Sequence, residues 1–318
     1  MNAPASIATA ASTDAAAPAL PPPQRNWLIP LALLSLYLVW GSTYLAIRIA
    51  LESWPPFLMA AIRFAIAGGL MYAWLRWRGV APPTRRQWRN AAIVGTLLLL
   101  GGNGLVCYAE QSVSSGIAAV AVASMPLFAT VFNGLYGEWP QRYEWLGLVI
   151  GFGGVVLLNL GSTLSGSRIG AVALVMAAAL WALGSSWSRR QDMPQGPMST
   201  AAQMLCASVA LALTATLSGE RLPAHPTPTA TLAIGYLVVF GSIIGFSAYI
   251  FLLRSVRPAL STSYAYVNPP VAVLFGVLLG GEHVGPVDLA GMGVILLGVI
   301  LVILARGKTA RRMRAAQR

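Results

Sequence analysis

Two stretches of this chain, about 143 residues apart, carry the same residues in the same order inside long apolar runs. Each has a Ser-Val pair followed by a proline, a glutamate and two glycines, with one extra residue before the glutamate of the second stretch. An apolar chain built from two like halves is typical of membrane carriers, whose substrate site lies between the halves. The matched positions are Ser112, Val113, Pro126, Glu138, Gly147 and Gly154, and then Ser255, Val256, Pro269, Glu282, Gly291 and Gly298.

The apolar runs predict a membrane protein, not a soluble one. Only 9% of the 318 residues are charged and 57% are hydrophobic, whereas a soluble domain carries about 25% charged residues. About 20 apolar residues span a bilayer, and the runs predict ten such helices. Their ranges are about 28–48, 57–77, 89–110, 115–136, 143–160, 169–188, 198–217, 230–252, 259–279 and 287–305.

The predicted fold class is an all-α polytopic membrane protein whose ten transmembrane helices form two inverted five-helix repeats. Because five is odd, the second repeat begins on the opposite side of the membrane, so a pseudo-two-fold axis in the membrane plane relates the halves. Further matches about 141 residues apart support the repeat, such as Trp40 with Trp181 and Pro56 with Pro197. The predicted divisions are a disordered Ala/Pro-rich tail at 1–26, repeats at 27–161 and 168–305, and a basic cytoplasmic tail at 306–318.

The charge distribution predicts the orientation of the chain. The net charge is +12, and the arginines flank apolar runs, which indicates membrane topology and anionic lipid as a partner, and not nucleic acid. With the N-terminus inside, seventeen Lys and Arg fall in inner segments and three in outer ones. Both termini are therefore expected in the cytoplasm, at a bacterial inner membrane. Cys107 and Cys206 fall in apolar runs and are expected to be free thiols.

Polar and aromatic side chains recur three or four residues apart on single helical faces. For one residue, hydrogen bonding between helices or ring packing is the simpler explanation. The whole set favours a cavity for a small amphipathic solute, because unpartnered polar groups are costly in hydrocarbon. The candidate substrate-binding residues are Trp40, Thr43, Tyr44, Asn103, Cys107, Tyr108, Pro126, Trp181, Phe246, Tyr249, Tyr264, Asn268 and Pro269.

Prolines within the fourth and ninth apolar runs predict helix breaks. Pro126 and the Pro269-Pro270 pair each remove an N–H group and free a carbonyl. Interrupted helices at corresponding positions of two repeats indicate a transport site. A kink needed only for packing is an equally good explanation.

Charged residues are scarce within the predicted helices. The acids fall in loops, tails or helix ends, so no proton relay is expected and facilitated efflux is favoured. Glu110, at the outer end of its helix, is a weak candidate for ion coupling, and Glu138 and Glu282 are interpreted as caps or loop partners. Arg63 lies inside the second helix, where a structural role is favoured over attraction of a substrate carboxylate. Glycines such as Gly154 indicate a scaffold or a dimer face, so a monomer and a homodimer both remain open.

Several short motifs resemble the EamA family of the drug/metabolite transporter (DMT) superfamily. They are the segment 40–44 (Trp-Gly-Ser-Thr-Tyr), Arg63-Phe64, Pro126 with Gly137-Glu138, and Pro269 with Gly281-Glu282. The resemblance covers about residues 28–305, although Met125 precedes Pro126 where the second half has Asn268 before a proline pair. It implies a cavity lined mainly by helices one, three, four, six, eight and nine. It also implies export of amino acids or related metabolites, the aromatic amino acid exporters being one such group.

The sequence therefore predicts a secondary transporter, not an enzyme, because no metal cluster, phosphate loop or nucleophile motif appears. The expected substrate is a small amino-acid-like metabolite exported by alternating access, with no cofactor. Two alternatives remain: a membrane-embedded ligand sensor or assembly subunit without transport, and a proton-coupled exporter of drugs or other metabolites.

Overall fold

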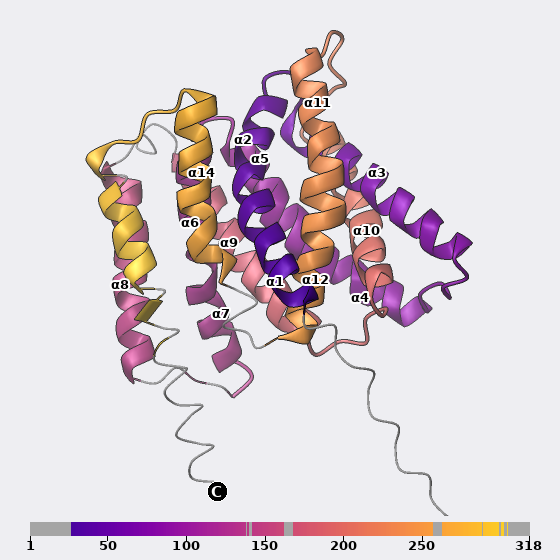
Figure 1. Ribbon diagram of the computed structural model, residues 1–318, viewed down its shortest axis with the longest axis horizontal. Coiled ribbons are helices and arrows are strands. Elements are labelled where there is room, and N and C mark those ends of the chain that lie inside the picture. The colour runs from indigo at the N-terminus through magenta and orange to yellow at the C-terminus, as the bar shows by residue number, and fades with distance from the viewer. Residues whose placement is uncertain are drawn as a thin grey trace, which may run out of the picture.

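The computed structural model describes residues 27–137, 139, 142–161, 168–256, 263–287, 289–298, 300–301 and 304, which form a helical bundle (Figure 1). Seven helical runs in this part are long and apolar enough to cross a membrane, and three of the remaining expected segments contain shorter apolar helices. The multi-pass, all-helical architecture is confirmed, and the count of ten spans stays a prediction. The seven runs are Leu28–Ala50, Pro56–Trp77, Arg85–Ala109, Ser115–Gly134, Arg168–Ser188, Pro197–Leu217 and Pro228–Ser255.

The first half contains five helical runs, some of them composite. They are α1 (Leu28–Ser35), η1 (Leu36–Trp40) and α2 (Gly41–Ala50); α3 (Pro56–Trp77); α4 (Arg85–Gly95), η2 (Thr96–Gly104) and α5 (Leu105–Ala109); α6 (Ser115–Val122) and α7 (Met125–Gly134); and α8 (Arg142–Gly161). The second half contains α9 (Arg168–Ser188); α10 (Pro197–Leu217); α11 (Pro228–Tyr236), η4 (Leu237–Phe246) and α12 (Ser247–Ser255); α14 (Tyr264–Gly280); and the shorter apolar helix Leu289–Gly298.

Helices α3 and α10 begin and end in the same way, 140 or 141 residues apart. Both start with proline, which suits the first turn because its missing N–H would have no helical partner there. Both end at a glycine with positive φ, Gly79 at 79° and Gly219 at 72°. The next amide then bonds back to the last turn, from Val80 to the Leu75 carbonyl at 3.0 Å and from Glu220 to the Ala215 carbonyl at 2.9 Å. These matching ends support the predicted repeat.

Three of the membrane-crossing runs contain a π-helical segment near the middle of the bundle: η1, η2 and η4. In such segments each backbone bond spans five residues, and they occur frequently at functional sites. Segments η2 and η4 contain Gly101 and Gly241, which lie 140 residues apart in the two halves. The irregularity is therefore shared by corresponding helices, although no residue type in the sequence signalled it.

The expected paired helix breaks occur in only one of the two halves. α6 ends at Val122 and α7 begins at Met125, so Pro126 lies in the first turn of α7, where its missing N–H would have no helical partner. In contrast, α14 runs unbroken through Pro269 and Pro270. The break predicted at Pro126 is confirmed. The one predicted at Pro269 is wrong, because each proline removes only its own N–H bond and the helix continues to Gly280.

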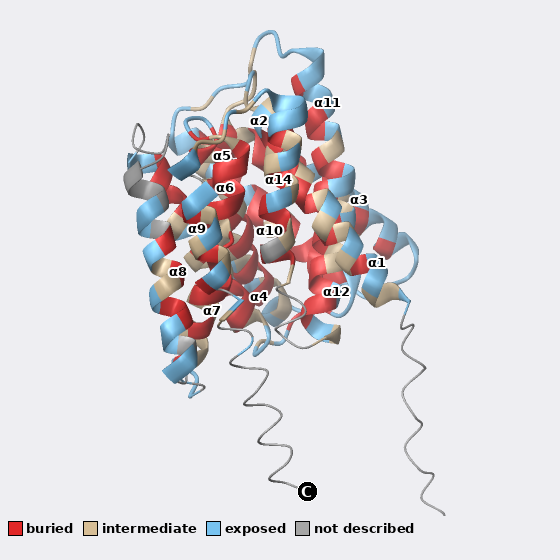
Figure 2. Cartoon of the chain, turned by 60° about the vertical axis from the view of Figure 1, so that its left-hand side comes forward, coloured by how far each residue is buried: buried red, intermediate tan, exposed pale blue. Residues whose placement is uncertain are grey.

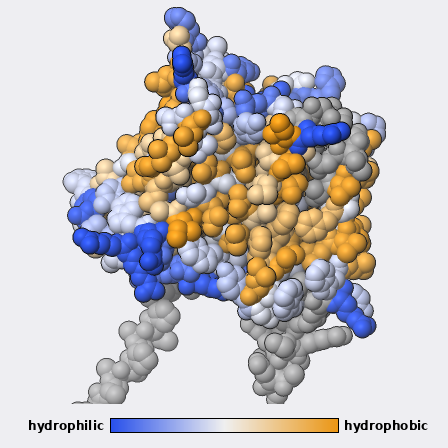
Figure 3. Space-filling model, turned by 180° about the vertical axis from the view of Figure 1, so that it is seen from behind, coloured by the Kyte–Doolittle hydropathy of each residue, from blue (hydrophilic) through white to orange (hydrophobic). Residues whose placement is uncertain are grey.

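Buried residues lie along the inner faces of the helices, and exposed residues lie outside (Figure 2). Many exposed side chains are large and apolar, including Leu70 (58% exposed), Leu232 (73%) and Leu217 (89%). Apolar side chains spread across the middle of the face shown in Figure 3, with polar groups towards its upper and lower edges. An outward-facing apolar surface of this kind suits lipid.

Helix α8 packs closely against the helix Leu289–Gly298 through the repeated glycines. A Cβ on Gly154 would lie 2.6 Å from the Ile295 backbone nitrogen, and a Cβ on Gly298 would overlap the Gly151 backbone. The structure thus gives these glycines a partner within the same chain, as the scaffold interpretation requires.

We expect Gly154→Ala to destabilise this helix pair by about 1–3 kcal/mol, because backbone atoms cannot move aside as a side chain can. Gly153→Ala is the matched control, since no heavy atom lies within 4 Å of the Cβ it would add. Thermal unfolding in detergent measures both. Equal midpoints for the two variants would show that the close approach is unimportant.

Candidate functional site

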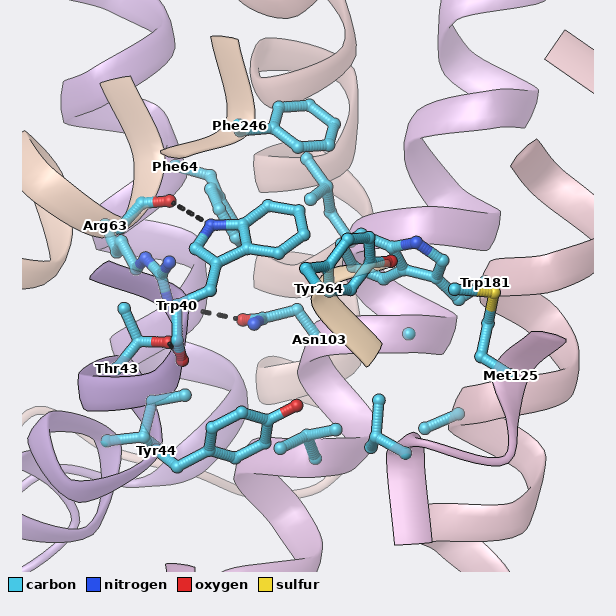
Figure 4. A pocket seen from close by; sticks show the side chains of 17 residues that line it. Trp40, Thr43, Tyr44, Arg63, Phe64, Asn103, Met125, Trp181, Phe246 and Tyr264 are labelled. Carbon is cyan, nitrogen blue, oxygen red and sulfur yellow. Dashed lines mark hydrogen bonds between the residues drawn. The ribbon is translucent and has the colours of Figure 1, made fainter. Parts of the chain in front are cut away.

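A cavity lies among the helices near the middle of the bundle (Figure 4). Its walls come from the first, third, fourth, sixth, eighth and ninth helical runs, which are the ones implied by the resemblance, and also from α3. It holds about 660 Å³ of empty space, including the part open to solvent.

Aromatic rings form one side of this cavity, with the Trp40 indole at their centre. Its centroid lies 5.5 Å from Trp181 and 5.2 Å from Tyr264, both edge-to-face, and 5.3 Å from Tyr249. Such offset geometries are favourable for aromatic pairs. The four rings come from both halves of the chain, so the cluster exists only where the halves meet.

Hydrogen bonds fix the rings in place. The Trp40 indole N–H donates to the Gly241 carbonyl at 3.1 Å, which joins η1 to η4. The Trp181 indole N–H donates to the Tyr249 hydroxyl at 3.2 Å, and that hydroxyl also bonds Ser185 at 2.6 Å. The rings are therefore pre-positioned before any solute enters, which lowers the entropy lost on binding.

Seven of the thirteen candidate residues line the cavity: Trp40, Thr43, Tyr44, Asn103, Trp181, Phe246 and Tyr264. The Thr43 hydroxyl is used within its own helix, where it donates to the Trp40 carbonyl at 2.7 Å. The polar part of the wall is therefore small and consists mainly of Tyr44, Asn103 and one charged group.

The other six candidates lie behind or beside the wall. Cys107 is buried with its thiol 3.6 Å from the Asn103 amide oxygen, and Tyr108 stacks on Phe57 at 5.8 Å. Tyr249 is buried beneath the rings. The buried Asn268 amide, with its nitrogen towards two carbonyls, donates to Leu36 at 3.1 Å and Tyr264 at 3.2 Å. The remaining two, Pro126 and Pro269, are buried within α7 and α14.

Arg63 lines the cavity from α3, and it was absent from the residues that the sequence selected. Its side chain is 3% exposed. Nε donates to the Ser242 hydroxyl at 2.7 Å, and Nη1 lies 3.4 Å from the Asn103 amide oxygen. The guanidinium also lies 4.8 Å from the Phe64 ring. The arginine therefore points into the site and not outward to the lipid surface (Figure 4).

No carboxylate in the described part of the chain forms an ion pair with Arg63, whose partners are a hydroxyl and an amide. A buried charge is costly unless a partner of opposite sign compensates it. The site is therefore positively charged as well as aromatic, and its charge comes from Arg63, for which the sequence favoured a structural role. The one available signal was that Arg63 is a charge inside an apolar helix, which is a functional hypothesis by default.

Both cysteines are free, as expected. No three His, Cys, Asp or Glu side chains gather into a possible metal site anywhere in the residues that the structure describes.

Comparisons with known proteins agree with this architecture. The model of the EamA-like transporter family matches residues 27–160 and again residues 168–304. The chain is 49% identical to YedA of Escherichia coli K12, named as an uncharacterized inner membrane transporter, over 88% of this chain and 92% of its relative. It is 23% identical to the uncharacterized transporter YoaV of Bacillus subtilis 168, over 86% and 96%. A solved crystal structure matches with a TM-score of 0.64 at 23% identity, over 87% of this chain and 98% of the other, which is a likeness of fold.

Proposed function

This chain belongs to the EamA-like transporter family, and we propose that it exports small amino-acid-like metabolites, aromatic amino acids among them, across the inner membrane by alternating access. Ten helices in two inverted repeats, at 27–161 and 168–305, are part of the same proposal.

The observation that carries the proposal is the pairing of Arg63 with an aromatic wall in one cavity. A guanidinium binds a carboxylate through parallel N–H bonds, and the rings around Trp40 offer apolar area to a flat side chain. A solute with a carboxylate at one end and a ring at the other satisfies both parts. An aromatic amino acid has this shape.

Alternating access requires contacts between the halves that can be broken at either end of the cavity. At the predicted outer end, the Glu220 carboxylate accepts hydrogen bonds from the Phe57 and Leu58 amides at 3.2 and 2.7 Å. At the predicted inner end, the Arg190 guanidinium lies 3.9 Å from the Tyr136 ring centroid. Opening one end means separating one such set while the other stays closed.

Exposed arginines on one face support cytoplasmic termini and contact with anionic lipid. They surround the loop between α3 and α4, and a cluster of this kind attracts the negative headgroups of the inner leaflet. They are Arg76, Arg78, Arg85, Arg86 and Arg89. We propose that this face lies against the cytoplasm, with the chain acting as a monomer or a homodimer.

Flux measurements in proteoliposomes test the function directly. Labelled aromatic amino acids, other amino acids and a sugar phosphate are offered separately to vesicles containing the protein. We expect the amino acids with rings to equilibrate faster than in empty vesicles. A binding signal with no flux in the same vesicles would instead support the sensor alternative, and movement only under a proton gradient would exclude facilitated efflux.

Alanine at Trp40 or Tyr264 is expected to reduce this flux at least tenfold, because burying apolar surface of this size contributes about 1.5–3 kcal/mol. Asn268→Ala is expected to reduce it less, because that amide holds the Tyr264 helix and lies behind the wall. Trp74→Ala is the matched control, since this ring is 54% exposed on the outside of α3. Wild-type flux in all three test variants would contradict the site.

A further inference from the structure

Glu110 is a fully buried carboxyl group at the end of α5, one residue beyond the run Arg85–Ala109. Neither of its carboxyl oxygens has a hydrogen-bond partner among the described residues. An ionised carboxylate in such a place is strongly disfavoured, whereas a protonated one carries no charge to desolvate.

No charged side chain forms a direct bond with the Glu110 carboxyl group in the described part of the chain. The Arg48 guanidinium on α2 donates instead to the backbone carbonyls of Glu110 and Val113, at 2.7 and 3.0 Å. The Glu282 carboxylate accepts from the Ser115 and Gly116 amides at the start of α6, at 2.9 and 3.2 Å. The helix N-terminus stabilises the charge of Glu282, which leaves a negative group near Glu110.

The other titratable groups near this carboxyl come from neighbouring elements. Tyr44 of α2, which lines the cavity, and Cys107, on the preceding turn of α5, both interact electrostatically with Glu110. Further off, Glu220 caps α3 and His283 follows Glu282. α6 has no titratable side chain, and Arg168 is exposed at the start of α9.

Glu110 lies between the central cavity and a groove on the predicted outer face. Val106, one turn earlier on the same helix, lines the cavity together with Tyr44. Arg48 and Ser112, which flank Glu110 on the other side, line the groove together with Glu282. The carboxyl group therefore occupies the barrier between the two spaces, where opening would let water reach it.

We propose that Glu110 is a proton-binding site, protonated while the outer end is closed and deprotonated when that end opens. The proton site stands by itself, and its part in opening rests on the proposed transport function. Opening separates Glu282 from α6, which removes one negative neighbour and exposes Glu110 to water and to the Arg48 guanidinium. A proton taken up from outside then accompanies closure.

Burial raises the pKa of the Glu110 carboxyl well above its usual range, and the charge of Glu282 raises it further while Arg48 opposes the shift. A carboxyl whose pKa is higher in the folded state stabilises the fold below its unfolded value of about 4.5, and this contribution is lost as pH rises towards the folded value. The unfolding midpoint of the wild type should therefore fall with rising pH across that window. Glu110→Gln, which mimics the protonated form, should remove this slope.

Infrared spectroscopy of the full chain in nanodiscs tests the site without any substrate. The probe is the carbonyl band of a protonated carboxylic acid at neutral pH, taken as the difference between the wild type and Glu110→Gln. We expect the band in the wild type, its loss in the variant, and no change in Glu52→Gln, an exposed acid of the same outer face. Glu110→Met, of similar volume, repeats the test if the glutamine variant does not fold. Carboxylate bands in the difference, or no difference at all, would overturn the proposal.

Flux at several external pH values then separates this proposal from the transport function. If the band is present and no solute moves, the proton site stands and the transport proposal fails. If solute moves equally in Glu110→Gln and wild type at every pH, transport stands and the gating role of Glu110 is overturned.

Discussion

Arg63→Met will abolish the preference of this protein for solutes that carry a carboxylate. Each charge-assisted hydrogen bond to a carboxylate contributes about 1.5–3 kcal/mol, so losing even one weakens binding by about tenfold or more. The measurement compares labelled phenylalanine with its decarboxylated amine in the same binding assay. The wild type should favour the amino acid, and the variant should bind both weakly and alike.

The same variant should keep its fold. It loses the hydrogen bonds to Ser242 and Asn103, but it also loses a buried charge without a described carboxylate partner, and the two effects oppose each other. Arg63→Lys keeps the charge without the planar fork and should give an intermediate preference. Ile66→Met on the outer side of α3 is the control, since its side chain is 45% exposed. Unchanged discrimination in a folded Arg63→Met protein would assign Arg63 to structure alone.

Gly245→Ala should block transport by moving the central ring of the site. The added methyl group would overlap the Trp40 indole and lie 3.2 Å from the Phe240 carbonyl oxygen. The indole must then break its bond to Gly241 and move from its place among the rings. We expect flux to fall at least tenfold and stability to fall by about 1–3 kcal/mol.

A matched glycine in the same helical run separates this effect from helix propensity. Gly235→Ala adds a methyl group with no heavy atom within 4 Å, and alanine in a helix is more stable than glycine by about 1 kcal/mol. It should therefore transport normally. Trp40→Phe, with its smaller ring, should partly restore the stability of Gly245→Ala. If the effects of the two substitutions on stability are simply additive, the overlap with the Trp40 indole is not the cause of the destabilisation.

Most of the fold followed from the sequence because apolar length and arginine placement are direct consequences of a bilayer. Prolines marked the starts of α3 and α10, and seven candidate residues do line the cavity. These features depend on local chemistry, which a single sequence displays.

Features that depend on how neighbouring helices pack could not be predicted from the sequence. Arg63 was not among the predicted lining residues, whereas α3 packs so that its guanidinium reaches Ser242 of η4 and lines the cavity. Tyr249 and Asn268 share a helical face with lining residues but lie behind the cavity wall. Helical spacing predicts which residues share a face, and it does not predict their distance from the cavity. The break predicted at Pro269 was wrong because a proline removes one backbone hydrogen bond, and the remaining bonds of α14 carry the helix through it.

Among the described residues, two acids cap helices on the predicted outer face. Both belong to the second half of the chain, and both cap helices of the first half. Glu220 holds the start of α3, and Glu282 holds the start of α6. Val80 follows α3 at the position where Glu220 follows α10, so the two residues correspond in the repeat. The valine side chain has no hydrogen-bond acceptor. The two halves of the chain are therefore no longer interchangeable. A chimaera that joins the first half of this chain to the second half of a relative will keep these helix starts satisfied only if the donor brings both acids with it.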